Sequence, residues 1–121
     1  LAEGGFTLLE LSIVLTIVMI LATLAYPSFT QSVVKAREAA LKQNLFVVRD
    51  VIDQYRADNG TYPDSLADLV SAGYLKRIPL DPITKSNETW QEIADEEEGG
   101  IFDVRSGSDL LSRDGTPYNQ W

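Results

Sequence analysis

Apolar residues follow one another almost without interruption in the first part of the chain. From Phe6 to Ala25 there are 20 residues with a single charge, Glu10. A helix of this length rises about 30 Å, which matches the hydrocarbon thickness of a membrane. None of its faces is reserved for polar side chains, as a surface helix of a globular domain would require. We therefore predict a membrane-spanning helix.

Two other interpretations of this segment are less favourable. A helix buried in a globular core would need more surrounding chain than a 121-residue protein provides. A secretory signal would have a shorter apolar region, a basic flank before it and a small-residue cleavage site after it. Here no base precedes the segment, and Tyr26-Pro27-Ser28-Phe29 follows it. We expect the segment to be retained in the working protein.

After Pro27 the apolar residues recur with the period of an amphipathic helix, which ends at Asn59-Gly60. A proline inside a helix usually kinks it, so we predict a kink at Pro27. One apolar stripe consists of Val34, Leu41, Leu45, Val48, Ile52 and Tyr55. A second stripe consists of Val33, Ala36, Ala40, Val47 and Val51. Both stripes could face one core, or one could face the protein's own sheet and the other neighbouring helices.

The rest of the chain predicts a small head. A short helix is expected over 65–72, a proline-rich loop over 78–82, and strands over 89–93 and 100–105, with a weak strand near Tyr118. The fold class is therefore α+β, with a long N-terminal helix packed on a small antiparallel sheet. We expect four divisions: a leader remnant (1–5), a transmembrane helix that becomes the filament core (6–26), an amphipathic helix (27–59) and a globular head (60–121).

Composition narrows the possible functions. The chain has 18 acidic and 10 basic residues, a net charge of −8, no cysteine and no histidine. Disulfides, thiolate zinc sites and nucleophiles that depend on cysteine or histidine are excluded. The negative charge argues against nucleic-acid binding. A membrane-anchored hydrolase using paired Asp and Glu is disfavoured because the head is small, so we expect no enzymatic activity.

Glu10 is the anomalous residue of the apolar segment. A carboxylate within such a segment costs several kcal/mol unless it is paired. The nearest base in the sequence is Lys35, roughly 37 Å away along a helix. A free amino terminus on a neighbouring subunit would be a suitable partner. The alternative is that Glu10 is protonated or lies near the membrane interface.

The segment Gly5-Phe6-Thr7-Leu8-Leu9-Glu10, opening an apolar helix, resembles the signal of type IV pilins and type II secretion pseudopilins. In that family a prepilin peptidase cleaves after the glycine and methylates the new amino terminus. The resemblance implies cleavage between Gly5 and Phe6 and N-methylation of Phe6. It also implies that Glu10 pairs with the amino terminus of an adjacent subunit during assembly. Pro27 lies where the family has a helix-bending proline.

The residues before the cleavage position differ from the family's pattern. Family leaders are usually basic, as orientation by cytoplasmic positive charge would require. Residues 1–5 carry one acid, Glu3, and no base. We interpret them as the remnant of a longer leader, or as a start that differs from the biological one.

Three further segments resemble the major pseudopilin of type II secretion: Tyr62-Pro63, Leu80-Asp81-Pro82 and the run from Phe102 to Asp109. That pseudopilin has a calcium site in its last loop. By resemblance, Asp109 and Asp114 would bind calcium together with loop carbonyls. The alternative is that both aspartates cap turns.

The resemblance implies a type IV pilin-like fold and a homo-oligomeric filament that drives protein export in type II secretion. The subunit would cross the inner membrane once before assembly and form a periplasmic or extracellular filament afterwards. Its partners would be a prepilin peptidase and the secretion or pilus assembly machinery. A pilin of a true pilus, for adhesion, motility or DNA uptake, is the near alternative, and the absence of a cysteine-closed loop favours the pseudopilin. A single-span membrane-anchored interaction protein is a more distant alternative.

Overall fold

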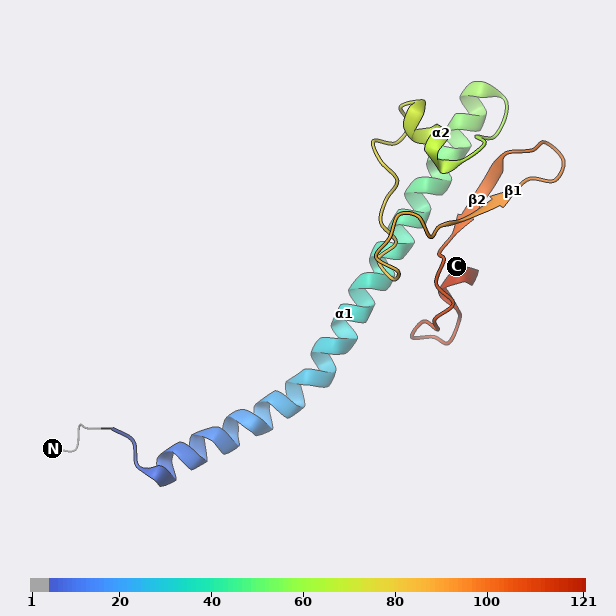
Figure 1. Cartoon of the computed structure of the whole chain (residues 1–121). Coiled ribbons are helices and arrows are strands. Elements are labelled where there is room, and N and C mark those ends of the chain that lie inside the picture. Colours follow the sequence, from blue (N-terminus) through green and yellow to red (C-terminus); the bar gives the residue numbers. More distant parts are fainter. Residues whose placement is uncertain (1–4) are drawn as a thin grey trace. The chain divides into compact units, whose positions relative to one another are not determined.

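The structure is a computed structural model and describes residues 5–121 (Figure 1). Residues 1–4 of the expected leader remnant lie outside the described part. The elements in chain order are helix α1, helix α2, strands β1 and β2, and a 3-10 helix, η2. Their bounds are Leu8–Asn59, Leu66–Ser71, Gln91–Ala94, Ile101–Arg105 and Tyr118–Gln120. The helix and the antiparallel sheet confirm the predicted α+β class and are consistent with a type IV pilin-like fold.

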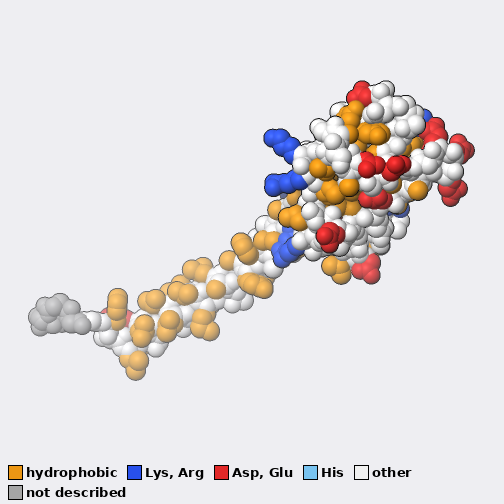
Figure 2. Space-filling model, turned by 45° about the horizontal axis from the view of Figure 1, so that its top comes forward, with side chains coloured by type: hydrophobic (Ala, Val, Ile, Leu, Met, Phe, Trp, Pro, Cys, Tyr) orange, Lys and Arg blue, Asp and Glu red, His pale blue; other side chains and the backbone are white. Residues whose placement is uncertain are grey.

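The first part of α1 is apolar and uncovered. The chain divides into two compact units between Val34 and Lys35, and α1 contributes to both. An 18-residue window of α1 has a mean hydropathy of 2.5 and no buried residue. By length and composition, this helix is able to cross a membrane. Figure 2 shows the hydrophobic side chains that follow one another along this part of α1.

The few polar side chains in this part of α1 bond to their own helix. The hydroxyls of Ser12, Thr16 and Thr23 donate to the carbonyl oxygens four residues earlier, at 2.9, 2.8 and 2.8 Å. Their hydrogen-bonding capacity is thereby partly satisfied without water. These residues do not interrupt the apolar character of the helix surface.

Pro27 lies inside α1, and the helix continues through it. Because proline has no N–H, it cannot donate to the carbonyl oxygen of Thr23. Beyond it, the Thr30 hydroxyl donates to the carbonyl oxygen of Tyr26 at 2.8 Å. The single predicted helix is confirmed from Leu8 onward, and the kink at Pro27 stays a prediction.

The second part of α1 is the main support of the head. Leu41, Leu45, Val48 and Ile52 of the first apolar stripe are buried, with exposed fractions of at most 3 %. The other elements place apolar side chains against them. These side chains are Leu66 and Leu69 of α2, Ile101 and Val104 of β2, Tyr118 of η2, and Trp90 in the loop before β1.

The second apolar stripe is divided between core and surface. Val51 is buried, whereas Ala36 and Ala40 are exposed and Val47 is 38 % exposed. Within the unit from Lys35 to Trp121, most of this stripe has no covering element. This favours separate packing partners for the two stripes over a single core.

The sheet is a hairpin of two short antiparallel strands, with Gln91 opposite Arg105 and an irregular register after Ile93. The loop between the strands, residues 95–100, contains four consecutive acids and is mostly exposed. Arg56 of α1 binds one of them, Glu98, through both terminal guanidinium nitrogens. Both side chains are accessible to solvent, so the ion pair contributes little to stability.

The prediction of a strand near Tyr118 is wrong. Tyr118 begins η2, and only an isolated bridge joins Leu111 to Pro117. Proline cannot donate to a strand ladder, and the turn that follows it directs the Tyr118 ring into the core. The predicted short helix over 65–72 is confirmed by α2, whose N-cap Ser65 accepts a hydrogen bond from the Asp68 N–H.

The segment after β2 is fixed against the loop that precedes β1. Asp81 is fully buried, and its carboxylate accepts from the Ser106 hydroxyl at 2.5 Å and from the Ile83 N–H at 2.8 Å. Next to Ser106, the backbone of Gly107 passes so close to Thr89 that a side-chain carbon would overlap the Thr89 carbonyl. The glycine is required by this close approach, and its φ is not in the left-handed region.

Replacing Gly107 by alanine should lower the free energy of unfolding by about 2 kcal/mol or more, because the added methyl group forces two backbone segments apart. Denaturant unfolding of the full chain in detergent, followed by the fluorescence of the buried Trp90, measures this change. Gly99→Asn is the control, because Gly99 has open space around it and asparagine tolerates its φ of 76°. Unchanged stability of Gly107→Ala would contradict the close approach.

Candidate functional site

The predicted cleavage position lies just before α1. Gly5, Phe6 and Thr7 have no regular secondary structure and are exposed, with Phe6 at 80 %. The helix begins at Leu8 because the Thr7 hydroxyl accepts the backbone N–H of Glu10 at 3.1 Å. The Gly5–Phe6 bond is therefore in accessible, non-helical chain, as a proteolytic site requires. Its cleavage stays a prediction.

Glu10 lies in the first turn of α1 and is exposed. There its negative charge interacts favourably with the positive end of the helix dipole. Thr7-Leu8-Leu9-Glu10 also has the spacing of a capping box, a local reason for an acid here that the apolar pattern alone does not reveal. The exposed carboxylate is available to a group on another chain.

Asp114 acts as the acceptor of its own turn. One of its carboxylate oxygens accepts from the Thr116 N–H at 3.0 Å, from the Thr116 hydroxyl at 2.6 Å and from the Ser112 hydroxyl. These hydrogen bonds, from Ser112 first and then Thr116, lower the pKa of Asp114 to about 2. This arrangement matches the turn-capping alternative.

Asp109 is exposed and lies five positions before Asp114. In residues 5–121, no group of three or more acidic side chains is arranged to hold a metal ion. Calcium takes six to eight oxygens, and the donors at Asp109 and Asp114 do not form such a set. The geometry therefore gives no support to the calcium site, which stays a prediction from resemblance.

A buried carboxylate on α1, Glu38, contacts the same loop. Only 5 % of Glu38 is exposed. Its two oxygens accept from the Arg113 N–H at 2.9 Å, from Arg113 Nε at 3.1 Å and from the Tyr118 hydroxyl at 3.1 Å. Glu38 is not among the functional residues that the sequence predicted. Glu38 stands in the seven-residue interval between Val34 and Leu41, at the one position where the apolar stripe has a charge.

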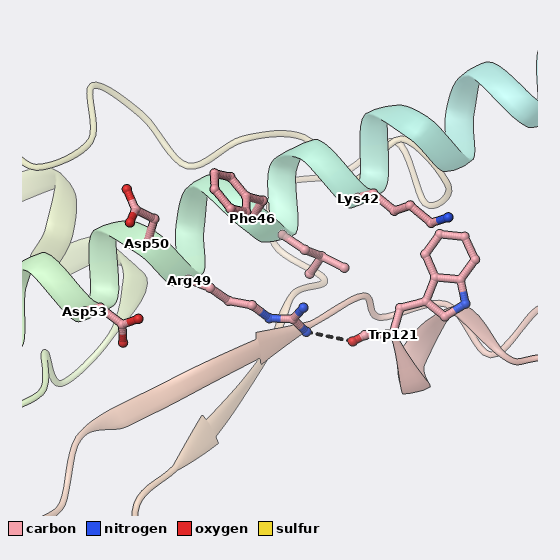
Figure 3. Close-up of a pocket in the computed structure, with 7 residues that line it drawn as sticks. Lys42, Phe46, Arg49, Asp50, Asp53 and Trp121 are labelled. Atoms are coloured by element: carbon pink, nitrogen blue, oxygen red, sulfur yellow. Dashed lines mark hydrogen bonds between the residues drawn. The ribbon is translucent and has the colours of Figure 1, made fainter.

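A groove of about 500 Å³ lies between α1 and the last residue of the chain (Figure 3). Arg49 reaches across it to the Trp121 carbonyl oxygen at 2.7 Å and also binds the Asp103 carboxylate at 2.7 Å. The Lys42 ammonium lies 5.0 Å from the centroid of the Trp121 ring. Phe46 lines the same groove and is 67 % exposed. These groups suit contacts with another surface better than catalysis.

Comparisons with known proteins agree with the sequence resemblance. The family description "Prokaryotic N-terminal methylation motif" matches residues 2–26. Type II secretion system core protein G of Aeromonas hydrophila is 32 % identical over 96 residues, covering 66 % of this chain and 67 % of that protein. The protein of the same name from Klebsiella pneumoniae is 34 % identical over 96 residues, covering 66 % and 69 %.

The chain belongs to the type II secretion system core protein G family.

A third relative of this name, from Klebsiella michiganensis, is 28 % identical over 136 aligned residues and covers 99 % of this chain and 94 % of its own length. No solved structure matches. For this pseudopilin the family resemblance stated from Gly5–Glu10 is confirmed. The matched motif includes Gly5, Phe6 and Glu10, but their individual roles stay predictions.

The Glu38 contacts predict a specific pH dependence. Burial acts to raise the pKa of Glu38, but the hydrogen bonds from Arg113 and Tyr118 outweigh it, so the pKa lies below its ordinary value of 4.5. A carboxylate with a lowered folded pKa adds stability above its unfolded pKa, and this stability is lost as the pH falls through the folded value. The Tm difference between the parent and Glu38→Gln should therefore be largest near neutral pH and shrink below about pH 4.

Thermal unfolding of both proteins between acid and neutral pH measures this difference. Glu88→Gln is the matched control, since it removes the charge of an exposed glutamate. A Tm difference between the parent and Glu38→Gln that does not change with pH would contradict an ionised Glu38 in the folded head.

Proposed function

We propose that this chain is the structural subunit of a type II secretion pseudopilus, held in the inner membrane before assembly and extracted into a homo-oligomeric filament. The observation that carries the proposal is the uncovered apolar part of α1, joined to a head that has its own core. Such a surface is stable in lipid or against other apolar helices, and unstable in water. The relatives' name favours a secretion filament over a pilus for adhesion, motility or DNA uptake.

The proposed maturation uses the segment before α1. A prepilin peptidase cleaves the Gly5–Phe6 bond and methylates Phe6, which gives Glu10 the fifth position of the mature chain. Support comes from the exposed, non-helical chain at Gly5–Thr7 and from the methylation motif matched over residues 2–26. The head then lies in the periplasm or outside the cell, and its role is structural.

The proposed assembly contact is an ion pair between Glu10 and the amino terminus of an adjacent subunit. Within the described chain, α1 offers no base before Lys35. An unpaired carboxylate among apolar helices is strongly unfavourable, so only a subunit whose Glu10 meets an amino group enters the filament without this penalty. The pair thereby selects one axial offset between neighbouring helices.

Glu10→Val should leave the subunit inserted in the membrane and abolish filaments, because the apolar segment stays intact while the partner of the amino group is lost. Electron microscopy of cells with a functional secretion machinery, together with membrane fractionation, measures both properties. Thr16→Val is the control, since it changes a polar residue on the same helix whose hydroxyl bonds only to α1. Filaments of normal number from Glu10→Val would refute the assembly role of Glu10.

Mass spectrometry of the protein isolated after co-expression with a prepilin peptidase should find an N-methylated Phe6 at the amino terminus. Gly5→Leu should remain uncleaved, because a side chain at this position blocks close approach of the peptidase to the bond. An intact Gly5–Phe6 bond in subunits taken from filaments would contradict the proposed maturation, whatever the result for Glu10.

A further inference from the structure

Residues 106–121 pass over the head as irregular chain that ends in the single turn η2. Its backbone hydrogen bonds, such as those from the Ser112 N–H to the Thr116 carbonyl oxygen and from the Tyr118 N–H to the Leu110 carbonyl oxygen, close the segment on itself. Other groups must therefore attach it to the rest of the head. A disulfide is excluded because the chain has no cysteine. The family resemblance suggests a bound calcium ion, but one Asp114 oxygen already accepts three hydrogen bonds within its own turn. With Asp109 exposed, this donor set is a poor fit for calcium.

Glu38 supplies the missing attachment from another element. It lies on α1 and binds groups that are 75 and 80 positions later in the chain. One carboxylate holds the backbone and the guanidinium of Arg113 and the hydroxyl of Tyr118. Hydrogen bonds to a charged acceptor are roughly twice as strong as neutral ones. The three donors also satisfy a carboxylate that is almost fully removed from water.

We propose that the Glu38 carboxylate fixes the C-terminal loop of this pseudopilin to α1 in place of a metal ion, so that the loop folds without calcium. The ion pair is asymmetric in burial, which makes Glu38 the essential member. The Arg113 side chain is 49 % exposed and can be solvated by water when its partner is lost. The Glu38 side chain is 7 % exposed and cannot be solvated without opening the loop.

Two further attachments extend the same principle to both ends of the loop. At its start, the buried Asp81 carboxylate accepts from the Ser106 hydroxyl. At its end, Arg49 of α1 donates to the Trp121 carbonyl oxygen (Figure 3). Side chains of residues before β1 therefore hold the loop near its beginning, middle and end, and all three contacts lie within the unit from Lys35 to Trp121.

The first measurement compares the full chain in detergent with added calcium and with a calcium chelator. We expect the same Tm in both, and no heat of binding when calcium is titrated into the chelator-treated, dialysed protein. A Tm that falls with the chelator and is restored by calcium would overturn the proposal, as would saturable calcium binding that Asp109→Asn and Asp114→Asn together abolish.

The second measurement tests Glu38 directly. Glu38→Gln should lower the Tm by roughly 10 °C or more with or without calcium, because three donors lose their charged acceptor. Glu88→Gln, the same change at an exposed glutamate, should leave the Tm unchanged. A Glu38→Gln protein as stable as Glu88→Gln would overturn the proposal.

A local readout separates loop attachment from general folding. Tyr118→Phe keeps the buried ring and removes only the hydroxyl that donates to Glu38, so the head should remain folded. In this variant, hydrogen exchange of the Arg113 amide should rise while that of β2 amides stays protected. If exchange at Arg113 is unchanged in Tyr118→Phe, or is slowed by calcium in the parent protein, Glu38 does not hold the loop in the proposed way.

Discussion

Two strands of four and five residues and a helix of six cannot form a stable domain by themselves. They are stable here because α1 presents Leu41, Leu45, Val48 and Ile52 as one continuous apolar surface. Each small element of the head places apolar residues against it. The head is therefore inseparable from the second half of the long helix, and every feature that positions the C-terminal loop depends on this packing.

Polar contacts hold the segment after β2 in place, in addition to the packing of the small apolar core. Asp81, Glu38 and Arg49 each bind the segment after β2, and each is itself held by apolar neighbours or by several hydrogen bonds. A buried carboxylate with all its donors present specifies one arrangement of a loop, because any other arrangement leaves it unsatisfied. In a chain without cysteine, these contacts perform the role that disulfides have in small secreted domains.

Local patterns in the sequence predicted the fold well where structure depends on neighbouring residues. The α1 periodicity, the short helix α2 and the β2 strand were all predicted because each depends on spacing or on one turn. The position of Tyr118 and the role of Glu38 were not, because both depend on contacts between residues far apart in the chain. The charge at Glu38 within an otherwise apolar stripe was the available signal. The hydrogen bonds of Asp114 could not be predicted either, because the residue type alone does not distinguish an aspartate that caps a turn from one that binds a cation.

The hydroxyls of Ser12, Thr16 and Thr23 affect what it costs to move α1 from lipid to a protein environment. Since each is bonded to a carbonyl of its own helix, none has to give up a bond to an outside partner when the neighbours of α1 change. Lipid tails and apolar side chains are similar solvents for such a surface. In the proposed assembly, a subunit would therefore leave the bilayer for a bundle of identical helices with little change in solvation free energy. Small differences in packing and the proposed Glu10 ion pair would then be sufficient to set the direction of the transfer.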